Sequence, residues 1–388
     1  MNFVFADRMY EAPSGVFHKI KIRKEQMLKE GRVVYDMSIG TPDFLPKQHI
    51  MEAMSKACLE PNNYKYSIVD LPELQQALIN HYKNRFNTSV TKDELTTVSG
   101  SQEGIAHLFL ALCNPGDLVL IPNPGYPIFE DGPKLAGADI YKYPLMEENN
   151  YLPKLDDIPI DIAQKAKAMI VSYPLNPIGV TAPDKFYEDL IRFASDNNIM
   201  IVHDNAYSDI VFEGVKGKSF LSYNGAKNVG IEFFSLSKSY NMTGARISFA
   251  VGNKEIISRF KSLRSRIDYG MFLPIQYAAI AALEGDQDGL IIQSKQYEER
   301  SKKLCNGLRK LGWDVKDSKG SMFLWCQIPN KYDSSEEFSN ILLEKAGVIC
   351  TPGTSFGSLG EGYVRFALVL NLEEIDKVIE AIRNSGVL

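Results

Sequence analysis

The chain has 388 residues, 45% of them hydrophobic, and this length suits two domains or one large domain with a smaller one appended. Its formal net charge of −5 is mild and no polybasic block stands out, which argues against a nucleic acid or an acidic membrane surface as a partner. We therefore expect small-molecule partners.

The cysteines and the apolar runs indicate a cytoplasmic protein. The five cysteines are widely spaced among apolar residues without a C-x-x-C pair, which predicts buried thiols in a reducing compartment. The N-terminus lacks an apolar segment of signal-peptide length, and no uninterrupted apolar run reaches the ~18 residues that a membrane helix needs. The five histidines show no metal-ligand spacing, so we expect no metal site.

The first two thirds of the chain predict alternating helices and strands. An arm and an amphipathic helix at 20–30 precede a strand at 33–39 and a turn at 40–43. Apolar periodicity then predicts helices at 49–58, 71–86, 102–112 and 185–197, and strands at 118–121, 168–171, 199–203, 231–234 and 247–251. This alternation predicts an α/β fold, a three-layer αβα domain whose mainly parallel sheet is covered by helices on both faces.

The last third of the chain has a different character. A polar stretch at 284–289 is followed by a long charged helix at 290–311, an apolar stretch at 313–315, a strand at 320–325, a helix at 335–346, a strand at 363–368 and a helix at 372–384. We therefore predict a large domain at 48–284 and a smaller α+β domain made of 1–47 and 285–388.

The most informative motif runs from Ser235 to Arg246 and contains Lys238. Lysine is the only side chain that forms a Schiff base, and pyridoxal phosphate is the common cofactor that needs one. Lys238 follows the strand at 231–234, where open α/β sheets place their chemistry. The spacing would bring Arg246 back to the cofactor phosphate, which a guanidinium holds with two hydrogen bonds. The alternative is a solvated loop lysine.

Two further segments provide groups for the same cofactor. Ser99-Gly100-Ser101-Gln102 opens a helix, whose free backbone N–H groups and dipole favour a phosphate. Asp204 ends an apolar strand, and the protonated ring nitrogen of the cofactor is a cation that would compensate its burial. Tyr207 lies close enough in sequence to reach the ring's phenolic oxygen. The alternatives are an ordinary N-cap at Ser101 and an N-cap of the next helix at Asp204.

Two proline-rich turns follow predicted strands and complete the set. The turn at 173–179 could aim the Asn176 amide at the phenolic oxygen, and the turn at 122–127 presents Tyr126 as a platform on which a flat ring stacks. Taken alone, the turn at 173–179 could be purely structural, and Tyr126 could be an aromatic residue of the core.

Taken together, the polar side chains at the ends of these predicted strands indicate one ligand, pyridoxal 5′-phosphate.

The motifs Ser-Leu-Ser-Lys and Asn-Met-Thr-Gly-Ala-Arg, with Asn-Pro-Gly-Tyr-Pro at 123–127 and Asp-Tyr-Gly-Met-Phe at 268–272, resemble the class I/II aminotransferases of fold type I. The resemblance covers essentially the whole chain and is strongest to the branch of LL-diaminopimelate, alanine and aspartate aminotransferases. It implies a Schiff-base and proton-transfer role for Lys238. It also implies contacts to the cofactor from Asp204 at the ring nitrogen, Asn176 and Tyr207 at the phenolic oxygen, Tyr126 at the ring face, and Ser101, Gln102, Ser235 and Arg246 at the phosphate.

The resemblance also implies the substrate contacts. Arg365, in the apolar strand at 363–368, would bind the α-carboxylate with two hydrogen bonds, the alternative being a structural ion pair. Gly40 lies in a segment that would close over the substrate, and Asn176 would contact the substrate as well. Cis peptide bonds are implied before Pro124 and Pro177.

The chain departs from the family pattern at five positions. Ile178 replaces a Thr and Leu175 a frequent Asn, so that turn loses polar contacts. Ser248 stands for a customary Gly or Ala. Asp70 takes the place of a glycine that marks the tyrosine reaching the partner subunit's phosphate. The expected position of that tyrosine is a lysine, flanked by Tyr64 and Tyr66, of which we favour Tyr66.

These features predict a homodimeric aminotransferase with shared active sites and a ping-pong mechanism, which moves the amino group of an L-amino acid to a 2-oxo acid, 2-oxoglutarate or pyruvate. The donor stays open, because it depends on pocket segments such as 17–20 and 266–272. One alternative is a carbon–sulfur β-lyase on the same fold. A second is a cofactor-binding regulator without turnover, although Lys238, Asp204 and Arg365 are all present.

Overall fold

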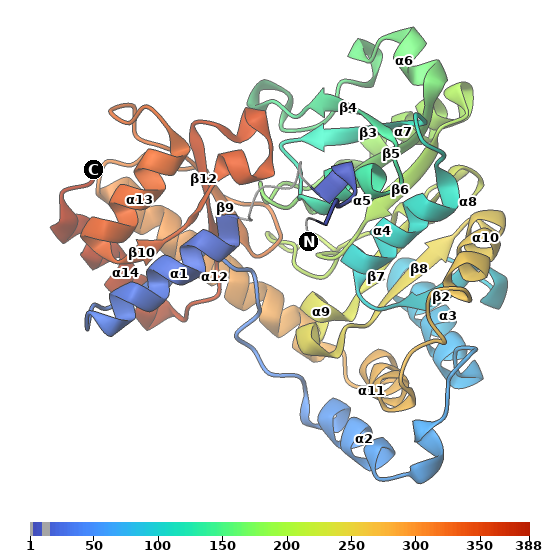
Figure 1. Ribbon diagram of the computed structural model, residues 1–388. Coiled ribbons are helices and arrows are strands. Elements are labelled where there is room, and N and C mark those ends of the chain that lie inside the picture. The colour runs from blue at the N-terminus through green and yellow to red at the C-terminus, as the bar shows by residue number, and fades with distance from the viewer. Residues whose placement is uncertain (1–2, 10–15) are drawn as a thin grey trace.

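The computed structural model describes residues 3–9 and 16–388, and no side chain among residues 16–21 is described. The predicted N-terminal arm and the segment 17–20 therefore lie partly outside the described residues. Figure 1 shows two groups of elements, one around a seven-stranded sheet and one around a three-stranded sheet, with a long helix between them. None of the described helices is both long enough and apolar enough to span a membrane.

The large sheet confirms the predicted α/β fold. Its strand order is β2-β8-β7-β6-β5-β3-β4, and all strands run in one direction except β8, which is antiparallel to both neighbours. The bounds are β2 (Leu95–Val98), β3 (Leu118–Asn123), β4 (Asp139–Pro144), β5 (Ala166–Ser172), β6 (Met200–Asp204), β7 (Gly230–Ser235) and β8 (Ser248–Gly252). The five strands predicted between residues 118 and 251 all correspond to central members of this sheet.

Helices cover both faces because the central strands are apolar on both sides. In β5, Ala168 and Ile170 belong to the apolar cluster under α4 (Ser101–Leu112), α5 (Ile128–Leu135) and α10 (Lys254–Arg264). Met169 and Val171 belong to the cluster on the opposite face. That cluster includes residues of α2 (Gln48–Cys58), α3 (Pro72–Phe86), α6 (Ile160–Lys165), α7 (Asp184–Asn197), α8 (Ala226–Val229) and α11 (Leu273–Glu284).

The second group of elements is built on the antiparallel sheet β11-β12-β9, made of β11 (Thr351–Pro352), β12 (Tyr363–Ala367) and β9 (Phe323–Gln327). Its helices are α12 (Asp288–Lys310), α13 (Ser335–Ala346) and α14 (Leu372–Ser385). From the N-terminal part come α1 (Val16–Lys29) and β1 (Tyr35–Asp36), which pairs with β10 (Val348–Ile349). These elements have an apolar cluster of their own, and the two domains with their boundaries stay a prediction.

Two predicted strands are wrong in extent. The strand predicted at 33–39 is only Tyr35–Asp36, because the Asp36 carboxylate accepts hydrogen bonds from the backbone N–H and the hydroxyl of Ser38 and so turns the chain. The strand predicted at 320–325 begins at Phe323, since Ser321 has a φ of 61°, which interrupts an extended chain. No strand forms at 313–315.

The peptide bonds before Pro124 and Pro177 are cis, as the family resemblance implied, and the bond before Pro174 is cis as well. All three lie in the turns that follow β3 and β5. These turns lie at the carboxyl ends of parallel strands, the edge where open α/β sheets bind ligands.

Candidate active site

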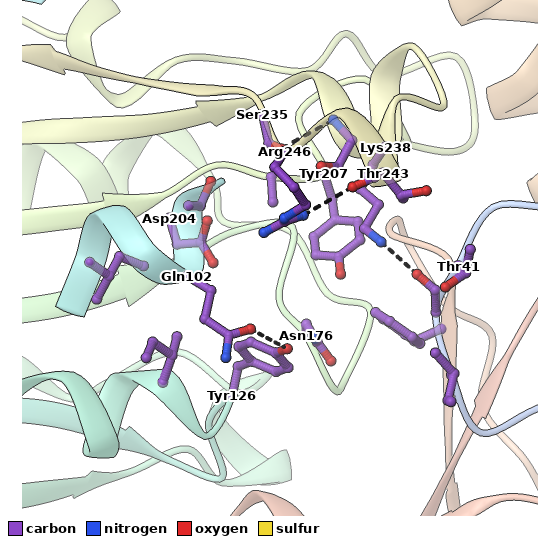
Figure 2. Close-up of a pocket in the computed structure, with 18 of the residues that line it drawn as sticks. Thr41, Gln102, Tyr126, Asn176, Asp204, Tyr207, Ser235, Lys238, Thr243 and Arg246 are labelled. Atoms are coloured by element: carbon purple, nitrogen blue, oxygen red, sulfur yellow. Dashed lines mark hydrogen bonds between the residues drawn. The ribbon is translucent and has the colours of Figure 1, made fainter. Parts of the chain in front are cut away.

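A cavity of about 520 Å³ lies at this edge of the large sheet, facing β9 and β12 (Figure 2). Eleven of the twelve residues predicted for the site line it: Gly40, Ser101, Gln102, Tyr126, Asn176, Asp204, Tyr207, Ser235, Lys238, Arg246 and Arg365. The twelfth, Tyr66, lies outside this cavity and is 81% exposed.

Lys238 lies in α9 (Leu236–Ser239), a single turn that follows β7 directly. Ser235 caps this turn by accepting a hydrogen bond from the Ser237 N–H, and it also accepts one from the Ser248 hydroxyl at 2.8 Å. The Lys238 Nζ donates to the Gly40 carbonyl at 2.5 Å. Burial lowers the pKa of the Lys238 amine to about 8, helped by the positive charges of Arg365 and Arg246. It is therefore no solvated loop residue.

Asp204 ends β6 and is buried, with one carboxylate oxygen, Oδ1, lacking any hydrogen-bond partner among the described residues. Burial raises its pKa to about 6, against the opposing effects of His203 and of the Ala206 N–H. A turn rather than a helix follows it, so the alternative role as an N-cap does not apply. An unpaired buried carboxylate of this kind requires a cation for compensation.

Another part of the cavity lining is suited to an anion. Gly100, with a φ of 91°, is the N-cap of α4, so Ser101 is the first helical residue and not the cap. The Ser101 hydroxyl is buried without a hydrogen-bond partner among the described residues. A Cβ on Gly100 would overlap the Arg246 guanidinium, which lies against this turn and donates to the Thr243 carbonyl. No carboxylate of the described residues pairs with Arg246, so its charge is available to a ligand.

The cavity lining also contains aromatic and amide groups. The Tyr126 hydroxyl donates to Gln102 Oε1 at 3.3 Å, and its half-buried ring lines the cavity (Figure 2). Burial raises the pKa values of both Tyr126 and Tyr207 above the ordinary tyrosine range, so both hydroxyls stay protonated and can donate. The turn departures Leu175 and Ile178 are buried in the apolar core.

Arg365 lies in β12 and is 2% exposed. It donates to Asn176 Oδ1 at 2.8 Å and to the Ser38 carbonyl at 2.6 Å, and its Nε has no partner among the described residues. Its guanidinium lies 4.1 Å from the Phe323 ring centroid, and desolvation lowers its pKa to about 10. No described carboxylate pairs with it, so the alternative of a structural ion pair is not what the structure contains. An incompletely paired, buried guanidinium that faces a cavity is suited to bind a carboxylate.

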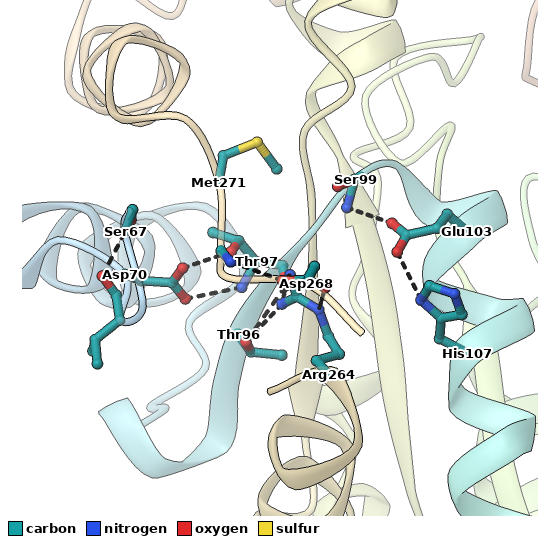
Figure 3. Close-up of polar contacts among 12 residues, drawn as sticks. Ser67, Asp70, Thr96, Thr97, Ser99, Glu103, His107, Arg264, Asp268 and Met271 are labelled. Carbon is teal, nitrogen blue, oxygen red and sulfur yellow. Dashed lines mark hydrogen bonds and ion pairs between the residues drawn. The ribbon is translucent and has the colours of Figure 1, made fainter. Parts of the chain in front are cut away.

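The strand that leads to Ser99 is held by side chains from several segments (Figure 3). Asp70 accepts from the Thr97 N–H at 3.0 Å and from its hydroxyl at 2.6 Å. The buried Arg264 binds the Thr97 carbonyl and forms two hydrogen bonds to Asp268, both 3.1 Å long. Beyond the strand, Glu103 accepts from the Ser99 N–H and pairs with His107. Asp70, a departure from the family pattern, thus has a defined contact.

Sequence reasoning missed several residues that line the cavity, among them Thr41, Thr243 and Phe323. A signal existed for Thr41 and Thr243, which are neighbours of Gly40 and Gly244 in motifs already singled out. None existed for Phe323, since an aromatic in an apolar strand is ordinarily a core residue. Among the described residues, no group of three or more His, Cys, Asp or Glu side chains is placed to hold a metal ion.

The family model described as aminotransferase class I and II matches residues 32–382 of this chain. The chain belongs to this family. It is 42% identical to an LL-diaminopimelate aminotransferase from Halothermothrix orenii, with 98% of each sequence covered, and 41% identical to one from Aquifex aeolicus, with 98% of this chain and 99% of the relative covered.

Solved structures of aminotransferases have the same fold. Substrate-bound BacF from Bacillus subtilis aligns over 98% of both chains with a TM-score of 0.95 and 34% identity. A probable N-succinyldiaminopimelate aminotransferase from Thermus thermophilus aligns over 96% of this chain and all of its own, with a TM-score of 0.90 and 31% identity. The chain is therefore a class I and II aminotransferase of fold type I, a pyridoxal-phosphate-dependent transaminase that acts on amino acids and 2-oxo acids.

The residues of the cavity fit this cofactor. The unpaired Oδ1 of Asp204 matches a protonated ring nitrogen, and the unpaired Ser101 hydroxyl, with the start of α4 and Arg246, matches a phosphate. The Lys238 amine lies in the same cavity. The groups that lack partners in the protein are thus of the types that pyridoxal phosphate would satisfy.

Proposed function

We propose that this aminotransferase uses LL-diaminopimelate as its amino donor and 2-oxoglutarate or pyruvate as its acceptor. The observation that carries the proposal is the name shared by relatives at about 40% identity over nearly the full length, LL-diaminopimelate aminotransferase. The comparisons lend no support to a β-lyase or to a non-catalytic regulator.

We propose the following roles for the cofactor contacts. Asp204 pairs with the ring nitrogen, Tyr126 lies against the ring, and Asn176 and Tyr207 bind the phenolic oxygen. The phosphate is held by Ser101, Gln102, Ser235 and Arg246. When bound, the cofactor supplies an electron-withdrawing ring that stabilises negative charge at the substrate Cα.

The remaining roles concern the substrate. Arg365 binds the α-carboxylate through two N–H groups and so orients the Cα–H bond, while Gly40 and Asn176 border the same space. Lys238 both anchors the cofactor and moves the Cα proton. Because its pKa is lowered to about 8, an appreciable fraction of the amine is neutral near neutral pH and able to accept a proton.

A panel of amino donors tests the proposal. The holoenzyme is mixed with LL-diaminopimelate, alanine, aspartate or glutamate, and the change in its visible spectrum is recorded before and after addition of each 2-oxo acid. We expect the highest kcat/KM with LL-diaminopimelate and parallel lines in double-reciprocal plots, as alternate loading of donor and acceptor requires. Turnover with another donor but not with LL-diaminopimelate would overturn the proposed substrate.

The same assays separate the two alternatives. Release of pyruvate and ammonia from cystathionine without any 2-oxo acid would identify a β-lyase. A stable cofactor spectrum that no donor changes would identify a regulator. A Lys238→Ala protein that still retained the cofactor covalently after borohydride reduction would contradict the role of that lysine.

We also propose a homodimer with shared active sites in the cytoplasm. An exposed apolar surface supports the dimer. Its residues are each at least 60% exposed and come from two neighbouring segments: Tyr64, Tyr66, Ile68, Val69 and Tyr269. Patches of this kind mark protein interfaces. All five cysteines are free thiols, which supports a reducing compartment. Sedimentation of the holoenzyme would test the dimer.

A further inference from the structure

Helix α12 contacts the main chain of the lysine segment. Gln293 and Arg300 lie seven residues apart on this helix, a spacing that places both on one face, and both are buried. Gln293 Nε2 donates to the Lys238 carbonyl at 2.7 Å, and its Oε1 accepts from the Asn241 amide at 2.8 Å. Figure 1 shows α12 running from beside α9 to the elements around β9 and β12.

Two turns further along the helix, Arg300 binds the segment that borders the cavity. Its two terminal nitrogens donate to the two oxygens of Asp43 at 2.6 and 2.7 Å. One of them also donates at 2.9 Å to the carbonyl of Leu368, which directly follows β12. The guanidinium lies 4.6 Å from the ring centroid of Phe44. Arg300 therefore connects the segment after Gly40 with the strand that carries Arg365.

This ion pair is stronger than an ordinary surface pair. Only 6% of the Arg300 side chain is exposed, against 34% for Asp43, and the paired geometry matches the planar fork of the guanidinium. Besides this ion pair, the turn at 39–44 is held by the Phe44 ring, whose centroid lies 5.3 Å from that of Tyr297, and by two main-chain contacts. Thr41 N–H bonds to the Ile39 carbonyl within the turn, and the Gly40 carbonyl accepts from Lys238. Loss of the Asp43 charge would therefore release one end of the turn.

We propose that Arg300 and Asp43 are positioning residues for the substrate carboxylate. Neither lines the cavity, but their ion pair fixes Gly40 and the end of β12 relative to Lys238, which the same helix holds through Gln293. The inference rests on the proposed roles of Lys238 and Arg365. Donor and acceptor both present an α-carboxylate to Arg365, so the ion pair influences the binding of both substrates and leaves the cofactor contacts intact.

The test compares Asp43→Asn with Asp376→Asn in the holoenzyme. Asp376 pairs at 2.6 Å with Lys303 on an exposed part of the same helix and serves as the matched control. For Asp43→Asn we expect KM to rise about tenfold or more for both the donor and the 2-oxo acid, with unchanged cofactor content and a smaller change in kcat. Asp376→Asn should stay within twofold of the wild type, and Asp43→Glu should recover part of the loss.

A second measurement is independent of turnover. Hydrogen–deuterium exchange of the holoenzyme should be faster at 39–44 in Asp43→Asn and unchanged in Asp376→Asn. If Asp43→Asn does not fold, Arg300→Lys takes its place, because lysine keeps the positive charge but cannot form the two parallel hydrogen bonds to Asp43. The same KM and exchange measurements are then made on that variant. The proposal is overturned if both KM values stay within twofold of wild type, or if kcat and cofactor content fall while KM is unchanged. If the wild type uses alanine or aspartate instead of LL-diaminopimelate, only the donor proposal fails, and the comparison proceeds with that donor.

Discussion

At the scale of single residues, Asp204 shows how a functional group is held at a cost in stability. Its carboxylate is buried with one oxygen unpaired, and burial raises its pKa to about 6 from an ordinary value near 4. A carboxyl with a raised pKa binds more protons in the folded than in the unfolded protein between these values, so its contribution to stability falls as pH rises through that window. Above about pH 6 the full cost of the buried charge is present.

The variant Asp204→Asn should therefore stabilise the protein stripped of its cofactor. We expect the free energy of unfolding at pH 7.5 to rise by about 1–3 kcal/mol, since a tenfold change in a protonation equilibrium corresponds to about 1.4 kcal/mol. The gain should shrink toward pH 4, where the wild-type carboxyl is protonated. Urea unfolding at pH 5 and pH 7.5 would show this, and a gain independent of pH would contradict the assignment.

Gly40 is a second residue whose identity is fixed by its surroundings. A Cβ at this position would lie 2.5 Å from Cζ of Phe323. The ring of Phe323 is buried and packs against the Arg365 guanidinium. We expect Gly40→Ala to lower kcat/KM by about tenfold or more through displaced substrate contacts, with the cofactor retained. Steady-state kinetics would measure this effect. Partial recovery in Gly40→Ala/Phe323→Leu would confirm the steric cause, and no recovery would argue against it.

At the scale of elements, the central strands and most helices could be predicted from sequence, whereas β2 and β4 could not. The strands β5, β6 and β7 are apolar on both faces and stand out as continuous runs. In contrast, β2 is the short edge strand Leu95–Val98 with two threonines, and β4 is an edge strand with exposed and charged residues. Edge strands lack a distinctive pattern, because their stability comes from pairing with remote segments.

The position of β2 depends on side chains that no local pattern reveals, among them Asp70. We expect Asp70→Asn to lower the free energy of unfolding by about 1–3 kcal/mol, because two hydrogen bonds from Thr97 to a charged acceptor are disrupted. Faster loss of cofactor should accompany this, since Thr97 lies two residues before Ser99. Urea unfolding and cofactor release would be compared with those of Asp93→Asn, an exposed neighbour. If the two variants had the same free energy of unfolding and the same rate of cofactor release, Asp70 would have no role in positioning β2.

The candidate site was predictable to a similar degree, for a related reason. Lys238 follows β7, Asp204 ends β6 and Arg246 precedes β8. A charged residue is unusual beside a buried strand, so each of the three could be recognised from its local sequence. The pair formed by Arg300 and Asp43 carried none, because the two residues lie 257 positions apart and each is ordinary in its own segment. Contacts of this kind follow from the packing of segments that are far apart in the sequence.

At the scale of the whole molecule, the exposed aromatic surface distinguishes the two candidate tyrosines. Tyr64 donates its hydroxyl to the Cys58 carbonyl of its own chain at 2.9 Å. Tyr66 is more exposed, and its ring packs against Tyr269 with centroids 5.1 Å apart. Among the described residues no acceptor is bound to its hydroxyl. In a dimer, Tyr66 is therefore the tyrosine with a hydroxyl available to the other subunit.

We expect Tyr66→Phe to raise the dissociation constant of pyridoxal phosphate about tenfold, the loss of one charge-assisted hydrogen bond, without changing the mass of the dimer. Tyr64→Phe should have a smaller effect on the cofactor. Fluorescence titration with the cofactor and sedimentation of both variants would measure the two quantities. An unchanged dissociation constant for Tyr66→Phe would rule out its contact with the phosphate.

The single reversed strand of the large sheet, β8, explains the sequence distance between Lys238 and Arg246. Because β8 is antiparallel to β7, Ser235 at the end of one strand is opposite Ser248 at the start of the next, and the chain between them stays at one edge of the sheet. A parallel strand would need a crossover of a dozen or more residues to return to that edge. The short interval of eight residues between Lys238 and Arg246 is thus possible because β8 is antiparallel to β7. Reversing the strand would separate the Lys238 amine from the Arg246 guanidinium by the full height of the sheet, whereas the present direction keeps both at the cavity.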